Sequence, residues 1–256
     1  MFVLGSARRA QHTFPAIRGT IVRMVGHGPC LRSDAATTLP ASTRLACCLL
    51  TCVLLACTLL ACAPSAVRLS RGPREYVSSD YQLVLKRWTR TAELITMSEL
   101  DNLLSVTATF ESYDFRWAYV VRYAHDYRLT VDQRRRLLDS TLAETVDRHQ
   151  FYVALYGTNW RWIDLNKPNA GWIVRLIDDV GNETAPEEIT WIRRPGAIER
   201  TYFPYTSPLR RVYRIRFAAT SSDGRPTISE EARWCGLRFA GAQGSQELRW
   251  DLERDE

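Results

Sequence analysis

The amino-acid sequence predicts a mainly β protein with inserted helices (α+β), in which one antiparallel, β-sandwich-like domain follows an apolar N-terminal signal helix. Three observations support this class. Several short segments after residue 170 alternate apolar and polar residues with period two, as strands with one buried face do. Residues 113–149 repeat their apolar positions with a helical period instead. Residues 80–256 are enough for a single domain with a sizeable core.

Charge separates a leader, residues 1–61, from the remainder. The leader carries six arginines and one acidic residue, a balance of +5, whereas residues 62–256 carry 28 basic and 27 acidic side chains, a balance of +1. The basic character of the whole chain therefore belongs to the leader. A nearly neutral domain has no net attraction for phosphate, which argues against nucleic acid as a partner.

The leader has the order of a secretory signal. Residues 1–44 form a basic n-region, and residues 45–61 form an uncharged apolar h-region that ends at a small residue. Arginines on the N-terminal flank favour the cytoplasmic side, so the chain after the run is expected outside the cytoplasm. The n-region is long for a signal, and a start at Met24 would shorten it.

The end of the apolar run reads Leu59-Leu60-Ala61-Cys62. This motif resembles the lipobox of bacterial membrane lipoprotein precursors. The resemblance covers the leader only. It implies that a diacylglycerol is joined to the Cys62 sulfur, that cleavage follows on the amino side of this residue, and that the new terminus is acylated, for example with palmitate. Two or three acyl chains hold a protein on a bilayer, because each buried methylene contributes about 0.8 kcal/mol.

Other interpretations of the run stay open. Leu54-Leu55-Ala56-Cys57 is a second match to the same pattern, and the apolar run is also long enough to span a membrane uncleaved. A freely secreted product is the third alternative. Cys62 is preferred because residues 62–79 begin a polar, Pro-containing stretch that is typical of a tether.

The first elements of the domain are expected to be strands and then a helical pair. Leu83–Ile95 and Leu103–Phe110 are predicted as strands, although the first also fits a helical face. A helix is predicted over 113–127, where aromatic residues recur every four positions. Thr130 offers an N-cap for a second helix over 131–149, whose opposite side carries the Arg134–Arg136 triplet.

The second half of the domain is expected to consist of strands. Residues 172–177 and 189–192 are predicted strands joined by the turn-rich segment 178–186. Tyr213, Ile215 and Phe217 alternate with polar or smaller neighbours, and the same alternation recurs around 237–239 and 248–252. Cys235, the one unmodified cysteine after cleavage at Cys62, is expected to be a buried structural thiol.

Catalytic and metal-binding signals are weak. His125 and His149 could converge from consecutive helices, but their spacing matches no common metal motif. Asp178-Asp179 and Glu187-Glu188 are pairs of adjacent acids. The two members of each pair would point to opposite faces of an extended chain, so neither pair forms the facing carboxylates of a glycosidase. Roles in turns and at strand edges are expected for them. No catalytic residue, metal ligand or cofactor is predicted. The sequence leaves open whether the protein is an enzyme, and it favours a non-catalytic role.

Aromatic residues crowd between positions 150 and 205. Exposed aromatic rings could stack on sugars, whereas buried ones would fill the core of a disulfide-free domain. The candidate ligand platform consists of Trp160, Trp162, Trp172, Trp191, Tyr202 and Tyr205.

Two function hypotheses follow. The first is a lipoprotein of the cell envelope, expected in the outer membrane and displayed on the extracytoplasmic side. Its domain would have a structural or interaction role with an envelope protein. The second is a glycan-directed binding module or hydrolase that uses the Trp160–Trp191 region on cell-wall glycan.

Overall fold

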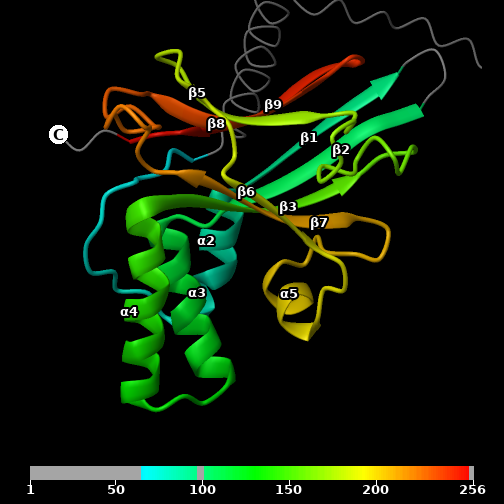
Figure 1. Cartoon of the computed structure of the whole chain (residues 1–256). Helices are drawn as coiled ribbons and strands as arrows, with labels where there is room; N and C mark the ends of the chain where they lie inside the picture. Colours follow the sequence, from blue (N-terminus) through cyan, green and yellow to red (C-terminus); the bar gives the residue numbers. More distant parts are fainter. Residues whose placement is uncertain (1–64, 97–100, 254–256) are drawn as a thin grey trace, which may run out of the picture. The chain divides into compact units, whose positions relative to one another are not determined.

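The computed structural model describes residues 65–96 and 101–253. The leader, Cys62 and the predicted signal helix lie outside these residues. The described chain is mainly β, with two antiparallel sheets and a few helices, which confirms the predicted α+β composition. Figure 1 shows three layers: the smaller sheet, the larger sheet beneath it, and the helices against the outer side of the larger sheet.

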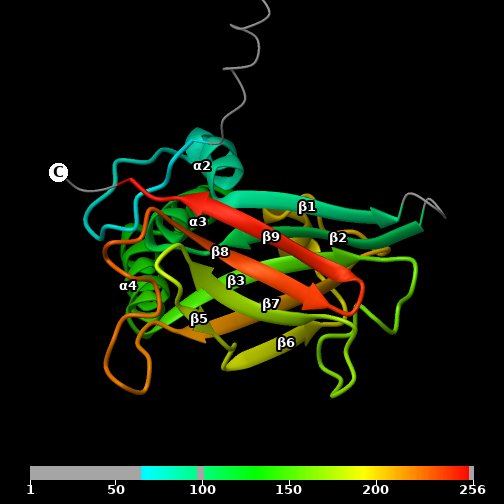
Figure 2. The same ribbon diagram turned by 90° about the horizontal axis from the view of Figure 1, so that it is seen from above.

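The larger sheet has five antiparallel strands, which are, in spatial order, β1 (Thr89–Thr96), β2 (Asp101–Phe110), β3 (Arg148–Tyr156), β7 (Arg211–Ala218) and β6 (Glu188–Ile192). The smaller sheet has four, in the order β5 (Glu183–Thr184), β4 (Ile173–Asp178), β8 (Trp234–Gly241) and β9 (Gly244–Asp251). Viewed from above, β9 lies near β1 at one edge of the layers (Figure 2). The Arg90 Nε atom bonds to the Arg249 carbonyl oxygen at 2.8 Å there.

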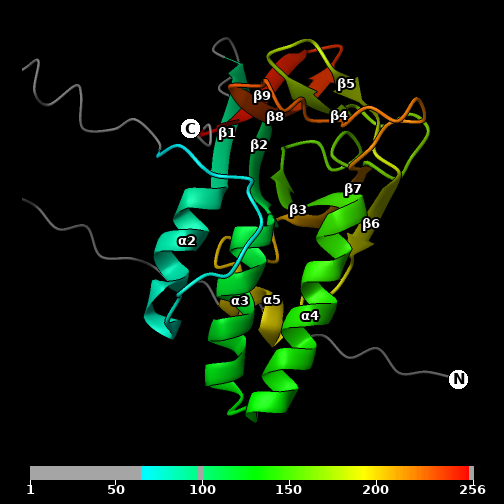
Figure 3. The same cartoon turned by 90° about the vertical axis from the view of Figure 1, so that its left-hand side faces the viewer.

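The helices are a 3-10 turn η2 (Ser78–Asp80), α2 (Tyr81–Trp88), α3 (Tyr113–Asp126), α4 (Val131–Asp147) and α5 (Ala197–Tyr202). Helices α2, α3 and α4 lie side by side beneath the larger sheet (Figure 3). Ser112 caps α3 by accepting a hydrogen bond from the Phe115 amide, and Thr130 caps α4 together with Gln133 in a capping box. The predicted helical pair is thus present, with α4 ending two residues earlier than expected.

An aromatic cluster fills the space between the sheets. Phe110, Phe151 and Phe217 of the larger sheet and Trp250 of the smaller one are at most 2% exposed. The Phe151 ring lies 4.5 Å from Phe110, 5.8 Å from Phe217 and 5.5 Å from Trp250, measured between centroids. Large aromatic side chains bury much apolar area each, so this cluster supplies stability without a disulfide.

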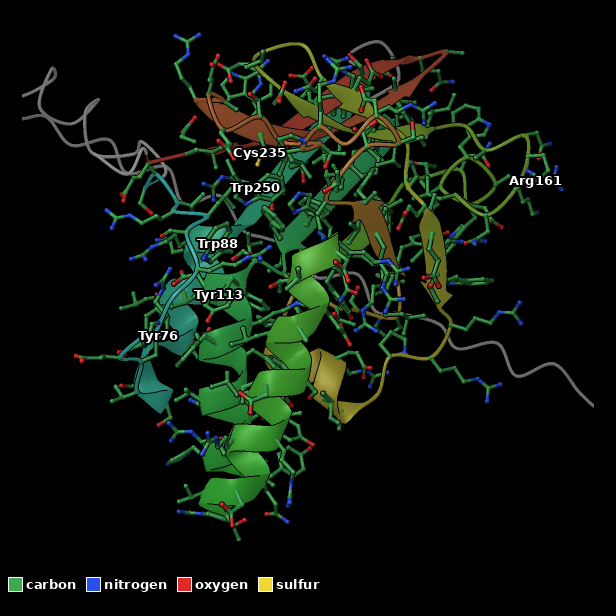
Figure 4. All side chains as sticks on the ribbon, turned by 60° about the vertical axis from the view of Figure 1, so that its left-hand side comes forward. Tyr76, Trp88, Tyr113, Arg161, Cys235 and Trp250 are labelled. Atoms are coloured by element: carbon green, nitrogen blue, oxygen red, sulfur yellow. The ribbon has the colours of Figure 1, made fainter. Side chains whose placement is uncertain are left out.

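Trp250 also connects the smaller sheet to the helical layer. Its indole nitrogen donates to the Trp88 carbonyl oxygen at 2.9 Å, and the Trp88 indole donates to Asp114 at 2.9 Å. Cys235 pairs with Trp250 across β8 and β9. Figure 4 shows Cys235, Trp250 and Trp88 in succession from the sheet toward α2. Strand register and helix packing are therefore fixed by the same buried residues.

Two predicted elements are wrong in part. The segment predicted as a strand from Leu83 is α2 as far as Trp88, because Tyr81, Val84, Leu85 and Trp88 are all buried with helical spacing. Strand β3 begins within the helix predicted over 131–149, and no element was predicted for its remaining residues. It is the central strand of its sheet and is buried on both faces, so it lacks the period-two signal.

Two connections also differ from expectation. Strands β4 and β6, which the sequence links through a turn, belong to different sheets. Within the predicted tether 62–79, described residues contact the domain. Val67 is 1% exposed and pairs in parallel with Leu252, while Arg74 and Tyr76 bond to Asp114 at 3.0 and 2.6 Å.

Candidate functional site

A polar row crosses the helix-facing side of the larger sheet. Cross-strand register aligns Glu188 of β6 with Arg216 of β7, and Arg216 with Gln150 of β3. Arg216 donates to Glu188 and to the Gln150 side-chain oxygen, both at 2.7 Å. The Gln150 amide then donates to Glu111 Oε2 at 2.6 Å. Because residues two apart in a strand share a face, this row lies opposite the aromatic core.

Arg116 of α3 closes the row from the helical layer. Its guanidinium is almost fully buried. It donates to the Glu111 carbonyl oxygen at 3.1 Å, and to the Thr141 carbonyl oxygen and the Glu144 carboxylate of α4, both at 2.8 Å. One buried arginine therefore connects α3, α4 and the end of β2. Arg116 also forms a buried ion pair with the Glu111 carboxylate at 3.7 Å, and such a pair is costly to break because the remaining charge is left without a partner.

A cavity of about 220 Å³ lies beside this row. We call it the Glu111 cleft, after the residues Glu111, Arg116, Gln150, Arg214 and Arg216 that form its polar side. Phe115, Tyr119 and Phe203 form its aromatic side. Burial raises the pKa of the Tyr119 hydroxyl well above its usual value, so this side chain is a neutral phenol across the physiological range.

Two polar atoms beside the cleft form a long ion pair. Among the described residues, Glu111 Oε1 and Arg214 Nε are buried without a hydrogen-bond partner. They lie 3.8 Å apart, too far for a hydrogen bond. The Glu111 carboxylate and the Arg214 guanidinium thus form an ion pair without a hydrogen bond beside the cleft.

The six residues of the predicted aromatic platform are divided among separate places. Trp172 and Tyr202 are buried, at 3% and 2% exposure. Trp162 and Trp172 line a small cavity of about 170 Å³, away from the Glu111 cleft. Tyr205 shares a hydrogen bond with Thr109 at 2.6 Å. Only part of the platform can thus meet a ligand in solution.

Trp160 and Trp191 do share a site. Both indole rings lie against the Arg211 guanidinium, whose central carbon is 5.2 Å from the Trp160 ring and 4.8 Å from the Trp191 ring. Arg211 also forms an ion pair with Asp164 at 2.8 Å. Trp160 is 43% exposed and Trp191 is half-buried. We call these three residues the Trp160–Arg211–Trp191 cluster. Such cation–π contacts order the rings and leave one of them accessible.

The two histidines line different cavities. His125 lies at the end of α3, near Tyr76 and Arg134. His149 is the second residue of β3 and packs against the Phe110 ring at 5.8 Å, and burial together with the Arg71 charge lowers its pKa to about 4. Within residues 65–96 and 101–253, no group of three histidine, cysteine or acidic side chains could hold a metal ion.

The remaining predicted features have structural partners. Cys235 is buried, and burial raises its thiol pKa to about 12, which makes it unreactive. Asp178 accepts three backbone amides of the turn that follows it, and Glu187 pairs with Arg148 at 3.2 Å. The arginine triplet on α4 is exposed.

Sequence reasoning did not single out the Glu111 cleft. The alternation in β7 does place Arg214 and Arg216 on one face, opposite Tyr213 and Ile215. Gln150 and Glu111 give no such signal, because their meeting depends on the order and register of three strands.

No described helix combines the length and the apolar composition that crossing a bilayer would require. In comparisons with known proteins, no family model, no curated protein and no solved structure matches this chain significantly.

Proposed function

We propose that the protein is a cell-envelope lipoprotein, anchored through Cys62 on the extracytoplasmic side and most simply in the outer membrane. Its domain binds an envelope partner rather than catalysing a reaction. The observation that carries the proposal is the short interval between the lipobox cysteine and the first docked residue of the domain. Cys62 precedes Val67 by only five positions in the sequence.

Val67 is held firmly in place. Its amide donates to the Asp251 carbonyl oxygen at 2.7 Å, and its carbonyl oxygen accepts from the Glu253 amide at 2.8 Å. A chain of five residues spans at most about 17 Å when fully extended. A lipid on Cys62 would therefore hold the Val67 edge of the domain close to the bilayer, and the domain would have a preferred orientation there.

The anchor is tested by acyl labelling and mass spectrometry of the full-length chain produced in a bacterial host. We expect a labelled, membrane-bound product that begins at residue 62. Cys62→Ser should lose both the label and the membrane fraction, whereas the matched variant Cys57→Ser should keep them. A full-length product with an unmodified Cys62 would show that the proposal is wrong.

A second candidate function is glycan binding at the Trp160–Arg211–Trp191 cluster. It is supported by the exposed Trp160 ring beside Trp191, because an accessible indole can stack on a sugar ring. Glycan-array binding should then be lost in Trp160→Ala and Trp191→Ala. Trp234→Ala is the matched control, since Trp234 also packs on an arginine, Arg249, but lies on the smaller sheet. An unchanged array profile in both test variants would exclude this function.

A further inference from the structure

We infer that the cavity beside His149 binds a small uncharged ligand that carries a hydroxyl or amide group on an apolar body. This cavity has a volume of about 750 Å³ and shares no lining residue with the Glu111 cleft. We call it the His149 cavity. The inference requires neither the lipid anchor nor the Trp160–Arg211–Trp191 cluster, and it starts from the imidazole ring.

The His149 ring carries two hydrogen-bonding atoms that the chain does not use. Because successive side chains of a strand point to opposite faces, His149 shares the face of Phe151, and its ring packs edge-on against Phe110. Among the described residues, neither ring nitrogen has a hydrogen-bond partner, and neither is one of the unpartnered polar atoms that are closed to solvent. Both nitrogens are therefore accessible from the cavity that this side chain lines.

The protonation state of the ring restricts the chemistry of the ligand. Burial lowers the pKa of His149 to about 4, and the charge of Arg71 acts in the same direction, so the imidazole is neutral near pH 7. A neutral imidazole donates from one nitrogen and accepts at the other. A hydroxyl or an amide group can meet both atoms, whereas a carboxylate only accepts and an ammonium group only donates.

The charged side chains around the cavity also favour an uncharged ligand. They are Arg71, Glu230 and Glu253, and all three are exposed. Glu253 forms an ion pair with Arg68 at 3.1 Å, and Arg71 donates to the Thr145 carbonyl oxygen at 3.2 Å. Once the Glu253 pair is set aside, one cation and one anion remain, so neither sign gains a net attraction.

The walls of the cavity supply the apolar surface. Leu69, Ile228, Ala232 and Leu252 line it, and two of them, Ile228 and Ala232, belong to the buried core at 7% and 3% exposure. The volume of about 750 Å³ lies within the roughly 300 to 1,000 Å³ that is usual for small-molecule sites, which are mostly apolar with a few polar groups. An alkyl body can therefore lie along these walls while its polar group meets the imidazole.

Four separate stretches of the chain build the cavity. They are residues 69–71, 146–149, 219–232 and 252–253. The first and the last of these follow the two partners of the Val67–Leu252 bridge, so docking of the N-terminal segment completes one wall. The site exists only in the folded chain, and no local sequence pattern marks it.

The test observes the histidine rings of the full chain in a non-ionic detergent by NMR, after ¹³C labelling of their Cε1 atoms. The probes share one alkyl chain and differ in the polar group: 1-hexanol, hexanamide, hexanoate and hexylammonium. We expect 1-hexanol or hexanamide to shift the His149 signal in a saturable way, and the charged probes to bind about tenfold more weakly or not at all. The exposed His125 ring is the internal control and should not respond. The His149 signal is identified by its loss in His149→Phe.

Ala219→Leu narrows the cavity from its wall and should abolish the response, whereas Ala143→Leu on the exposed side of α4 is the matched control and should keep it. Thr220→Leu, at an exposed position of the same lining, replaces Ala219→Leu if circular dichroism shows that this variant does not fold.

Three results would overturn the inference. The first is a His149 signal that no probe shifts, which would mean that the cavity holds water only. The second is a response to hexanoate or hexylammonium as strong as that to the uncharged probes, which would identify a charged ligand instead. The third is a response that persists unchanged in a folded variant with a narrowed cavity, which would place the probe elsewhere.

Discussion

The two faces of the five-stranded sheet are made by alternate residues of the same strands, yet they differ in chemistry. One face carries Phe110, Phe151 and Phe217, packed against Trp250 with little accessible surface. The other carries Gln150, Arg214 and Arg216 and lies beneath the helices. The aromatic face gains free energy from burial alone, whereas the polar face must satisfy each buried donor and acceptor. On the polar face, Glu111 Oε1 and Arg214 Nε are buried without a hydrogen bond, so this face is the less completely satisfied of the two.

The largest effect is expected from an aromatic residue of the core. Phe151→Ala removes a ring that contacts three others and leaves a cavity, so the free energy of unfolding should fall by about 3 to 5 kcal/mol. Chemical denaturation monitored by tryptophan fluorescence would measure this. A loss below about 1 kcal/mol would contradict the assignment of this face as the main source of stability.

The next effect concerns a titratable group on the aromatic face. His149 has a pKa of about 4 in the folded chain, below its ordinary value, so the unfolded state binds more protons between about pH 6.5 and 4. Stability should therefore be full above pH 6.5 and fall by roughly 1 to 3 kcal/mol as the pH drops to 4. Denaturation at several pH values would measure the slope. His149→Asn should flatten it, and an equal slope in both proteins would exclude His149 as its source.

A smaller effect is expected on the polar face. Gln150→Ala removes the side chain that joins Arg216 to Glu111, so one donor and one acceptor lose their partners. The free energy of unfolding should fall by about 2 kcal/mol, less than for Phe151→Ala. The same denaturation experiment applies. If the two losses were equal, the polar row would contribute as much as the core, and the contrast between the faces would not hold.

The smallest effect is expected for Arg214→Gln. Arg214 is about one-third exposed and faces Glu111 only at 3.8 Å. The stability change should stay within about 1 kcal/mol, as for other partly exposed ion pairs. A shift of the melting temperature measured without ligand checks this. A large loss of stability would mean that the long ion pair between Arg214 and Glu111 contributes more than its separation indicates.

The sequence allowed prediction of the composition of the fold and of the elements with a regular signal. Strands with one solvated or polar face, such as β7, show period two, and α3 shows its aromatic spacing directly. The central strand β3 could not be recognised, because burial on both faces removes the alternation. Helix α2 was missed since its apolar positions also fit a strand.

The candidate site was less accessible to sequence reasoning than the fold. Trp160 and Trp191 were named as ligand contacts from composition, and they do lie together, but Trp172 and Tyr202 from the same set are buried. The Glu111 cleft depends on residues from β2, α3, β3 and β7 that meet only through strand order. A local sequence pattern carries no information about contacts between residues that are far apart in the sequence.

The pairing of Val67 with Leu252 has a consequence for the order of folding during synthesis. The two backbone partners of Val67 are Asp251 and Glu253, which are translated among the last residues of the described domain. The segment around Val67 therefore cannot dock until residues 251 to 253 have been synthesised, and a long loop must close at that step. A nascent chain halted before residue 251 would keep the Val67 segment undocked, so synthesis of the end of β9 determines when this segment joins the domain.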